Sequence, residues 1–174
     1  MTFLLKQIFS FLKLLNSDTG TNQIAAGVAC GFILGMTPAF SLQTVLVILC
    51  MFFFRIQIGA ATITAFFFMF PAYLLDPLFH FIGQKVLELE SLKELFTTLY
   101  NLPIVPWTRF YNTIVMGSGV VAIVSSPFVF IFARILIFKY REKVLENIKQ
   151  TKFWNAIKAT SLYQWYYKYD SLYG

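Results

Sequence analysis

Charged side chains are scarce in this chain of 174 residues, where they make up 13% of the sequence; a soluble domain carries roughly 25%. Histidine and cysteine are rarer still, with one histidine and two cysteines. Their spacing gives neither a disulfide framework nor a metal-ligand motif, and no nucleophile, base and acid stand together in a catalytic pattern. We therefore expect a protein that is not an enzyme and that binds no metal or cofactor.

Apolar side chains take the place of the missing charge. Hydrophobic residues make up 58% of the chain, and phenylalanine alone contributes 21 residues. The run from Ile24 to Leu75 contains a single charged residue, Arg55. Because an apolar stretch longer than about 18 residues is typical of insertion into lipid, we predict an all-α integral membrane protein that forms one membrane domain over residues 1–174.

A proline divides the first apolar segment, residues 24–54. One unbroken helix of that length would measure about 46 Å, against about 30 Å of hydrocarbon in a bilayer. Pro38 lies near its middle and disfavours a helical conformation at Thr37. We predict a broken hairpin of two short helices that re-enters the membrane, and two thin, tilted spans are the alternative.

The tip of this hairpin is a candidate pathway, formed by Thr37, Pro38, Ser41 and Gln43. An amide without a partner at membrane depth costs several kcal/mol, on the order of apolar-transfer values. Gln43 must therefore pair inside the protein or face water. A purely structural hydrogen bond is the alternative to a pathway-lining role.

The other segments complete the layout. Apolar periodicity, turn residues and interfacial tryptophan predict an interfacial helix over 1–16, a span over 56–75, an external amphipathic helix over 76–101, a second span over 110–138 and a basic aromatic tail over 139–174. Asp76 is expected to be the N-cap of the amphipathic helix, with Pro77 at its first position. The expected fold is thus a short hairpin, two longer transmembrane helices and interfacial amphipathic helices.

Charge bias predicts the orientation. From Arg134 onward the chain has eight positive and three negative residues, a net +5, whereas residues 76–109 have three positive and four negative, a net −1. Because cytoplasmic segments are enriched in Lys and Arg, we expect both termini and Arg55 in the cytoplasm and residues 76–109 outside.

Three further groups of residues are candidates for a role. Four-residue spacing of small side chains predicts close helix packing, with a lipid or ion path along the groove as the alternative; the residues are Gly27, Gly31, Gly35, Ser118, Ala122 and Ser126. Asp76 and His80, four residues apart, form a candidate proton or pH pair, or else a helix cap beside an interfacial histidine. Contact with lipid headgroups is expected of Arg134, Lys139, Arg141 and Trp107.

One stretch resembles a known family. The run from Ile24 to Pro38 (IAAGVACGFILGMTP), its continuation through Leu42-Gln43-Thr44 to Arg55-Ile56, and the later run AYLLDPLFH at residues 72–80 resemble the bacterial membrane-protein family catalogued as domain of unknown function 2062. Members usually carry Asn-Pro after the third apolar segment, where this chain has Phe70-Pro71 and Asp76-Pro77. The resemblance implies a helical protein of the bacterial inner membrane and brings no established activity. The predicted spans make this a multi-pass protein.

Three functions fit this sequence. The first is a non-enzymatic component of lipid or envelope-material transport, scramblase-like or an accessory subunit of a larger complex. The second is a structural anchor or assembly factor for an envelope complex. The third is a proton-coupled small-solute transporter that uses Asp76 and His80. The expected partners are membrane lipids, a larger membrane or envelope protein and a second copy of the chain; the basic aromatic tail favours anionic lipid over nucleic acid.

Overall fold

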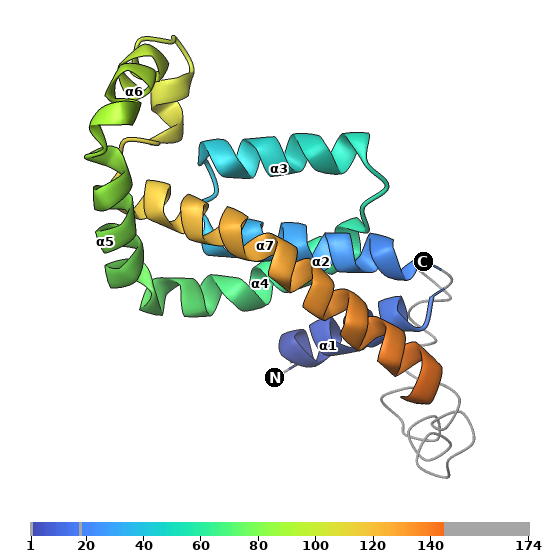
Figure 1. The fold of residues 1–174 in the computed structure, drawn as a ribbon. Coiled ribbons are helices and arrows are strands. Elements are labelled where there is room, and N and C mark those ends of the chain that lie inside the picture. Colours follow the sequence, from blue (N-terminus) through green and yellow to red (C-terminus); the bar gives the residue numbers. More distant parts are fainter. Residues whose placement is uncertain (1, 18, 145–174) are drawn as a thin grey trace. The chain divides into compact units, whose positions relative to one another are not determined.

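The computed structural model describes residues 2–17 and 19–144, and this part of the chain is helical throughout, with short connections (Figure 1). It divides into two compact units, Met1–Ile135 and Leu136–Gly174. The α-helices are α1 (Thr2–Leu15), α2 (Thr21–Met36), α3 (Leu42–Phe53), α4 (Ile58–Leu74), α5 (Asp76–Leu87), α6 (Lys93–Tyr100) and α7 (Thr113–Lys139). Shorter helical turns are η1 (Glu90–Leu92), η2 (Val105–Thr108) and η3 (Tyr140–Val144).

The break expected at Pro38 is present. Thr37, the residue before the proline, is extended at φ −105° and ψ 147° and ends α2, as the ring of a following proline requires. The chain resumes as α3 at Leu42. With 16 and 12 residues, the two helices measure about 24 and 18 Å, so each is shorter than the hydrocarbon layer of a bilayer.

Three glycines bring α2 and α4 into close contact. Gly27 lies against Gln57 and Ala60, and Gly31 lies against Ala61 and Thr64. Gly35 lies against Ala65 and Phe68, with Phe68 Cβ only 2.8 Å from where a side chain would begin. Each later glycine of α2 meets correspondingly later residues of α4, so the two helices run parallel and in register. The α2–α3 turn is therefore level with the C-terminal end of α4 (Figure 1).

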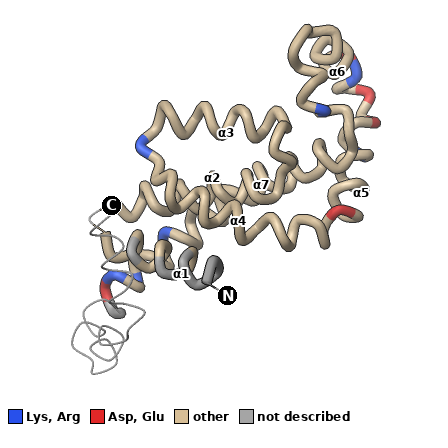
Figure 2. The backbone as a smooth tube through the Cα atoms, turned by 180° about the vertical axis from the view of Figure 1, so that it is seen from behind, with Lys and Arg blue, Asp and Glu red and all other residues tan. Residues whose placement is uncertain are grey.

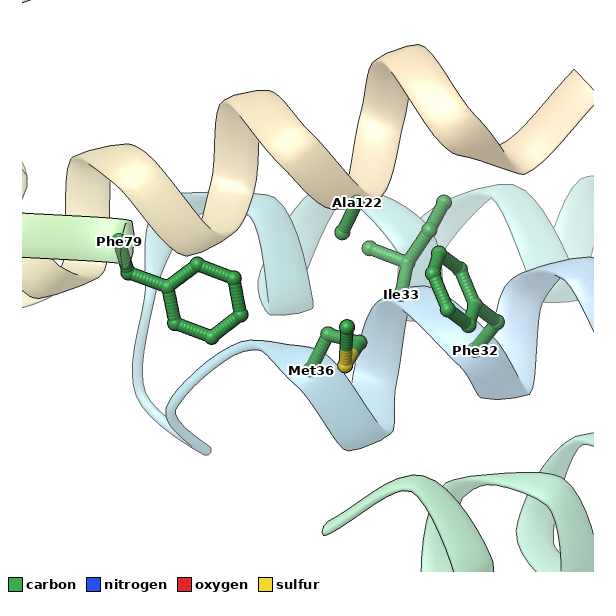
Figure 3. Packing of buried hydrophobic residues seen from close by; sticks show 5 residues of the cluster. All are labelled: Phe32, Ile33, Met36, Phe79 and Ala122. Atoms are coloured by element: carbon green, nitrogen blue, oxygen red, sulfur yellow. The ribbon is translucent and has the colours of Figure 1, made fainter. Parts of the chain in front are cut away.

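The core lies where α2, α5 and α7 meet. Phe32, Ile33 and Met36 from α2 pack with Phe79 from α5 and Ala122 from α7 (Figure 3). Phe68 of α4 meets Phe32 edge to face, with ring centroids 4.9 Å apart. Helix α2 is buried or half-buried along most of its length, whereas α5 and α7 leave many of their side chains exposed.

The amphipathic segment differs from the expectation. The structure bends by 81° between α4 and α5, and the single helix expected over 76–101 is divided into α5, η1 and α6 because Leu89 is extended at φ −65° and ψ 115°. Asp76 is not the N-cap. Leu75 holds that position in a helical conformation, since one residue joins α4 to α5 and the Phe79 N–H bonds to the Leu75 carbonyl.

Of the two longer spans expected, the structure bears out one. The helix from Thr113 to Glu142 is long and apolar enough to cross a membrane. Helix α4 has 17 residues and meets the same standard only when taken together with α5. Within the described residues, the chain therefore has one membrane-capable helix, or two if the bent pair is a single span.

Charge in the first unit gathers at the ends of its helices. Figure 2 shows one positive charge on the α3–α4 turn and a group of charges along α5 and α6, with an uncharged stretch between them; the residue on the turn is Arg55. The first unit also exposes many apolar side chains, such as Phe52 at 80% and Phe53 at 84% exposure at the end of α3. Extended exposed apolar surface of this kind is typical of contact with a membrane or with another protein.

Candidate functional site

Three hydroxyl groups close the α2–α3 turn. Ser41 is the N-cap of α3 and its Oγ accepts the Thr44 N–H at 3.2 Å, which satisfies one of the free donors at a helix start. Thr44 Oγ1 lies 3.0 Å from Ser41 Oγ and 3.0 Å from Thr37 Oγ1. All three side chains are buried, so the end of α2 and the start of α3 are held together by side-chain hydrogen bonds.

Each of the three hydroxyl protons has an acceptor within the turn. The Thr37 hydroxyl donates its one proton to the Ile33 carbonyl at 2.8 Å. In the contact between the two threonines, Thr44 must therefore be the donor, and the same proton also faces the Pro38 carbonyl at 3.0 Å. Ser41 is left to donate to Thr44. The hydroxyl cluster is thus a clasp that fixes the turn.

Gln43, next to this clasp, is not satisfied in the same way. Its amide oxygen Oε1 is buried and has no hydrogen-bond partner among the residues that the structure describes. Its side chain reaches from α3 to Gly119 of α7, and a Cβ at Gly119 would lie 2.8 Å from Gln43 Cγ and meet the amide group itself. An orphan acceptor of this kind costs about 1–3 kcal/mol. We call this contact between α3 and α7 the seam, and it contains a buried amide oxygen whose desolvation is not offset by a hydrogen bond to the described residues.

The small residues lie at helix contacts. Beyond the three glycines of α2, Ser118 and Ala122 of α7 are fully buried. Ser126 is half-buried, and its hydroxyl bonds to Ile123 of its own helix at 2.9 Å. The small side chains of Ser118 and Ala122 allow α7 to approach its neighbours closely.

Asp76 and His80 both lie on α5, where the structure gives His80 a partner on another helix. His80 Nδ1 is 2.7 Å from Thr113 Oγ1 at the start of α7. In the described part of the chain, no hydrogen bond joins Asp76 to His80. The histidine therefore ties α5 to α7.

The expected headgroup residues are spread along the chain. Trp107, on η2, is 83% exposed. Arg134 is exposed on α7 within the first unit, whereas Lys139 and Arg141 belong to the second unit. The rest of the basic aromatic tail, from residue 145 onward, lies outside the described residues.

Sequence reasoning missed Thr44, Gly119 and the contact of Gly83 with Gly117. The spacing Ser41-x-x-Thr44 is that of an N-cap and the third residue of its helix. The role of Thr44 could therefore have been recognised from the local sequence. Side chains at Gly83 and Gly117 would collide with backbone carbonyls of Thr113 and Phe79. Nothing in the sequence near either glycine shows that α5 and α7 cross there.

These features define a class: an all-helical protein with extensive exposed apolar surface and one or two membrane-capable helices. The chain belongs to a family described as uncharacterized proteins conserved in bacteria, domain of unknown function 2062, whose model matches residues 7–146. An uncharacterized protein of Treponema pallidum (strain Nichols) is 24% identical over 159 residues, which cover 91% of this chain and 98% of that protein. No solved structure matches the chain. The family resemblance of the sequence is confirmed.

Proposed function

We propose that this protein is a multi-pass component of the bacterial inner membrane that moves lipid or envelope material, without enzymatic activity and together with a larger partner. The observation that carries the proposal is at Gln43, whose buried amide oxygen has no hydrogen-bond partner within residues 2–17 and 19–144 and lies on the seam between α3 and α7. Polar groups at membrane depth are costly and are typical of substrate pathways.

Helix lengths support the same function. Helices α2 and α4 have 16 and 17 residues, about 24–26 Å each, and they lie in register. A bilayer of about 30 Å must become thinner to match them. A thinned bilayer beside a polar seam lowers the barrier that a lipid headgroup meets in crossing.

The register of α2 with α4 also bears on topology. Because the α2–α3 turn is level with the end of α4, the turn and Asp76 belong at one membrane face, and Arg55 belongs at the other. With the positive-inside bias, Arg55 and both termini are cytoplasmic and residues 76–109 are outside.

Reconstituted vesicles with fluorescent phospholipid test the proposal. A membrane-impermeant reductant bleaches only the outer leaflet, so the rate at which the inner pool becomes accessible reports transfer. We expect faster transfer with the full chain, alone or with copurified partners, than in protein-free vesicles, and a loss of this acceleration in Gln43→Leu. No acceleration under either condition contradicts the function.

A second candidate function is a membrane anchor for an envelope complex. The exposed apolar face of α3 favours it, because such a face suits a protein partner as well as lipid. Gly31 and Ala122 are buried within this chain, so bulky residues there would disturb the fold itself. The cleaner test is Leu49→Ala on the exposed face of α3. If the protein is an anchor, this variant should lose one defined partner during purification, and Gln43→Leu should keep it.

A further inference from the structure

The outer face of α3 is apolar and ends at a single positive charge. Helical spacing places its inner residues, Gln43, Thr44, Val47 and Met51, toward the rest of the first unit, where Thr44 is buried and Val47 packs beside the core. The opposite face consists of Val45, Leu46, Ile48, Leu49, Phe52 and Phe53, which are 43–84% exposed. We define these six residues as the outer α3 face.

Arg55 follows directly on the α3–α4 turn. It is the one charged residue between Asp18 and Asp76. Its side chain is exposed and makes no hydrogen bond or ion pair with the residues that the structure describes. Arg55 lies in a tight turn in which the Ile56 N–H bonds to the Phe54 carbonyl at 2.8 Å, and the Gln57 N–H bonds to the Gln23 carbonyl at 3.2 Å. The backbone of Arg55 is therefore fixed at the end of the outer α3 face.

We propose that the outer α3 face and Arg55 together bind an anionic phospholipid, with acyl chains along the face and the phosphate at the guanidinium. This inference rests on the membrane location proposed above and names the lipid class. Arginine matches the geometry of a phosphate oxygen pair, and the apolar face supplies no charge or donor that would favour a polar ligand.

Charge complementarity favours this lipid over a second copy of the chain. The acidic residues of the first unit after Asp18 are Asp76, Glu88, Glu90 and Glu94, all on or beside α5 and α6, at the other end of the helices from Arg55 (Figure 2). Two copies joined through α3 in a parallel arrangement would bring Arg55 beside Arg55. In the antiparallel arrangement, Arg55 would lie opposite the uncharged α2–α3 turn.

Photocrosslinking identifies the occupant. The full chain with Phe53→p-benzoylphenylalanine is placed in vesicles of equal phosphatidylglycerol and phosphatidylcholine, and mass spectrometry gives the ratio of the two lipids attached. The same probe at Phe128, which is 72% exposed on α7, reports the bulk ratio. An interfacial cation attracts an anionic lipid by about 1 kcal/mol, which corresponds to a roughly fivefold preference at the Phe53 probe.

Substitution of the charge decides the role of Arg55. We expect Arg55→Gln to bring the ratio at the Phe53 probe down to the bulk ratio and Arg55→Lys to keep most of the preference. Lys93→Gln, which removes an exposed charge on α6, should leave it unchanged. Equal capture of both lipids by the native chain overturns the proposal, as does crosslinking of the probe to a second copy in place of lipid. A preference without lipid transfer contradicts only the transport function, and transfer without a preference contradicts only this site.

Discussion

Replacing Gln43 by an apolar residue should stabilise the protein while removing its proposed activity. Leucine and methionine have nearly the volume of glutamine but no amide, so neither leaves an acceptor without a partner. An orphan buried acceptor costs about 1–3 kcal/mol, and Gln43 Oε1 is such an atom. For a chain of this size that gain raises the melting temperature by roughly 2–12 °C.

Thermal unfolding in detergent, followed by circular dichroism, measures the effect. Gln43→Met tests the same loss of the amide with an unbranched side chain, which suits the close contact with Gly119 better than the branched side chain of Gln43→Leu. Gln84→Leu is the matched control, because the Gln84 amide is exposed and donates to Glu88 at 2.7 Å; we expect no gain there. A lower melting temperature in both Gln43 variants would show that the amide is bonded in the folded state and refute the reasoning.

Three other substitutions test the packing. Gly31→Ala should lower the free energy of unfolding by about 1–2 kcal/mol in the same thermal assay, because the new Cβ meets Thr64 Cβ at 2.8 Å. The control Gly59→Ala meets only the end of a flexible leucine side chain and should be neutral or stabilising. Equal effects of the two substitutions would contradict the close contact between α2 and α4. Thr44→Val should cost about 1–3 kcal/mol, because it removes the donor to two partners of the clasp. A double-mutant cycle of His80→Ala and Thr113→Val should give a coupling energy of about 0.5–1.5 kcal/mol. A coupling energy of zero would contradict the hydrogen bond between His80 and Thr113.

Local chemistry made part of this fold predictable. Pro38 fixes the conformation of Thr37, so the end of α2 follows from two adjacent residues. The spacing of Gly27, Gly31 and Gly35 also indicates a close helix contact. A stripe without side chains can be recognised from the sequence of one helix alone. The last long apolar helix was also visible, because its length and composition are independent of its neighbours.

What the sequence did not reveal depends on how the helices cross. Which helix the glycine stripe meets is decided by the α3 connection, which returns the chain so that α4 runs beside α2. The division of the 76–101 segment depends on the extended conformation of Leu89, and the position of Asp76 depends on the sharp bend at Leu75. The place of Gln43 opposite Gly119 joins residues far apart in sequence, and neither residue alone indicates an unpaired amide.

The most direct test of the membrane arrangement is the sidedness of Arg55. In a chain with Cys30→Ser and Cys50→Ser, single Arg55→Cys and Lys93→Cys variants are treated with a membrane-impermeant maleimide, first in cells with an intact inner membrane and then after lysis. We predict that Lys93→Cys reacts in the intact cells and that Arg55→Cys reacts only after lysis. Reaction of Arg55→Cys in the intact cells would place the α3–α4 turn outside and contradict the arrangement on which the proposed function depends.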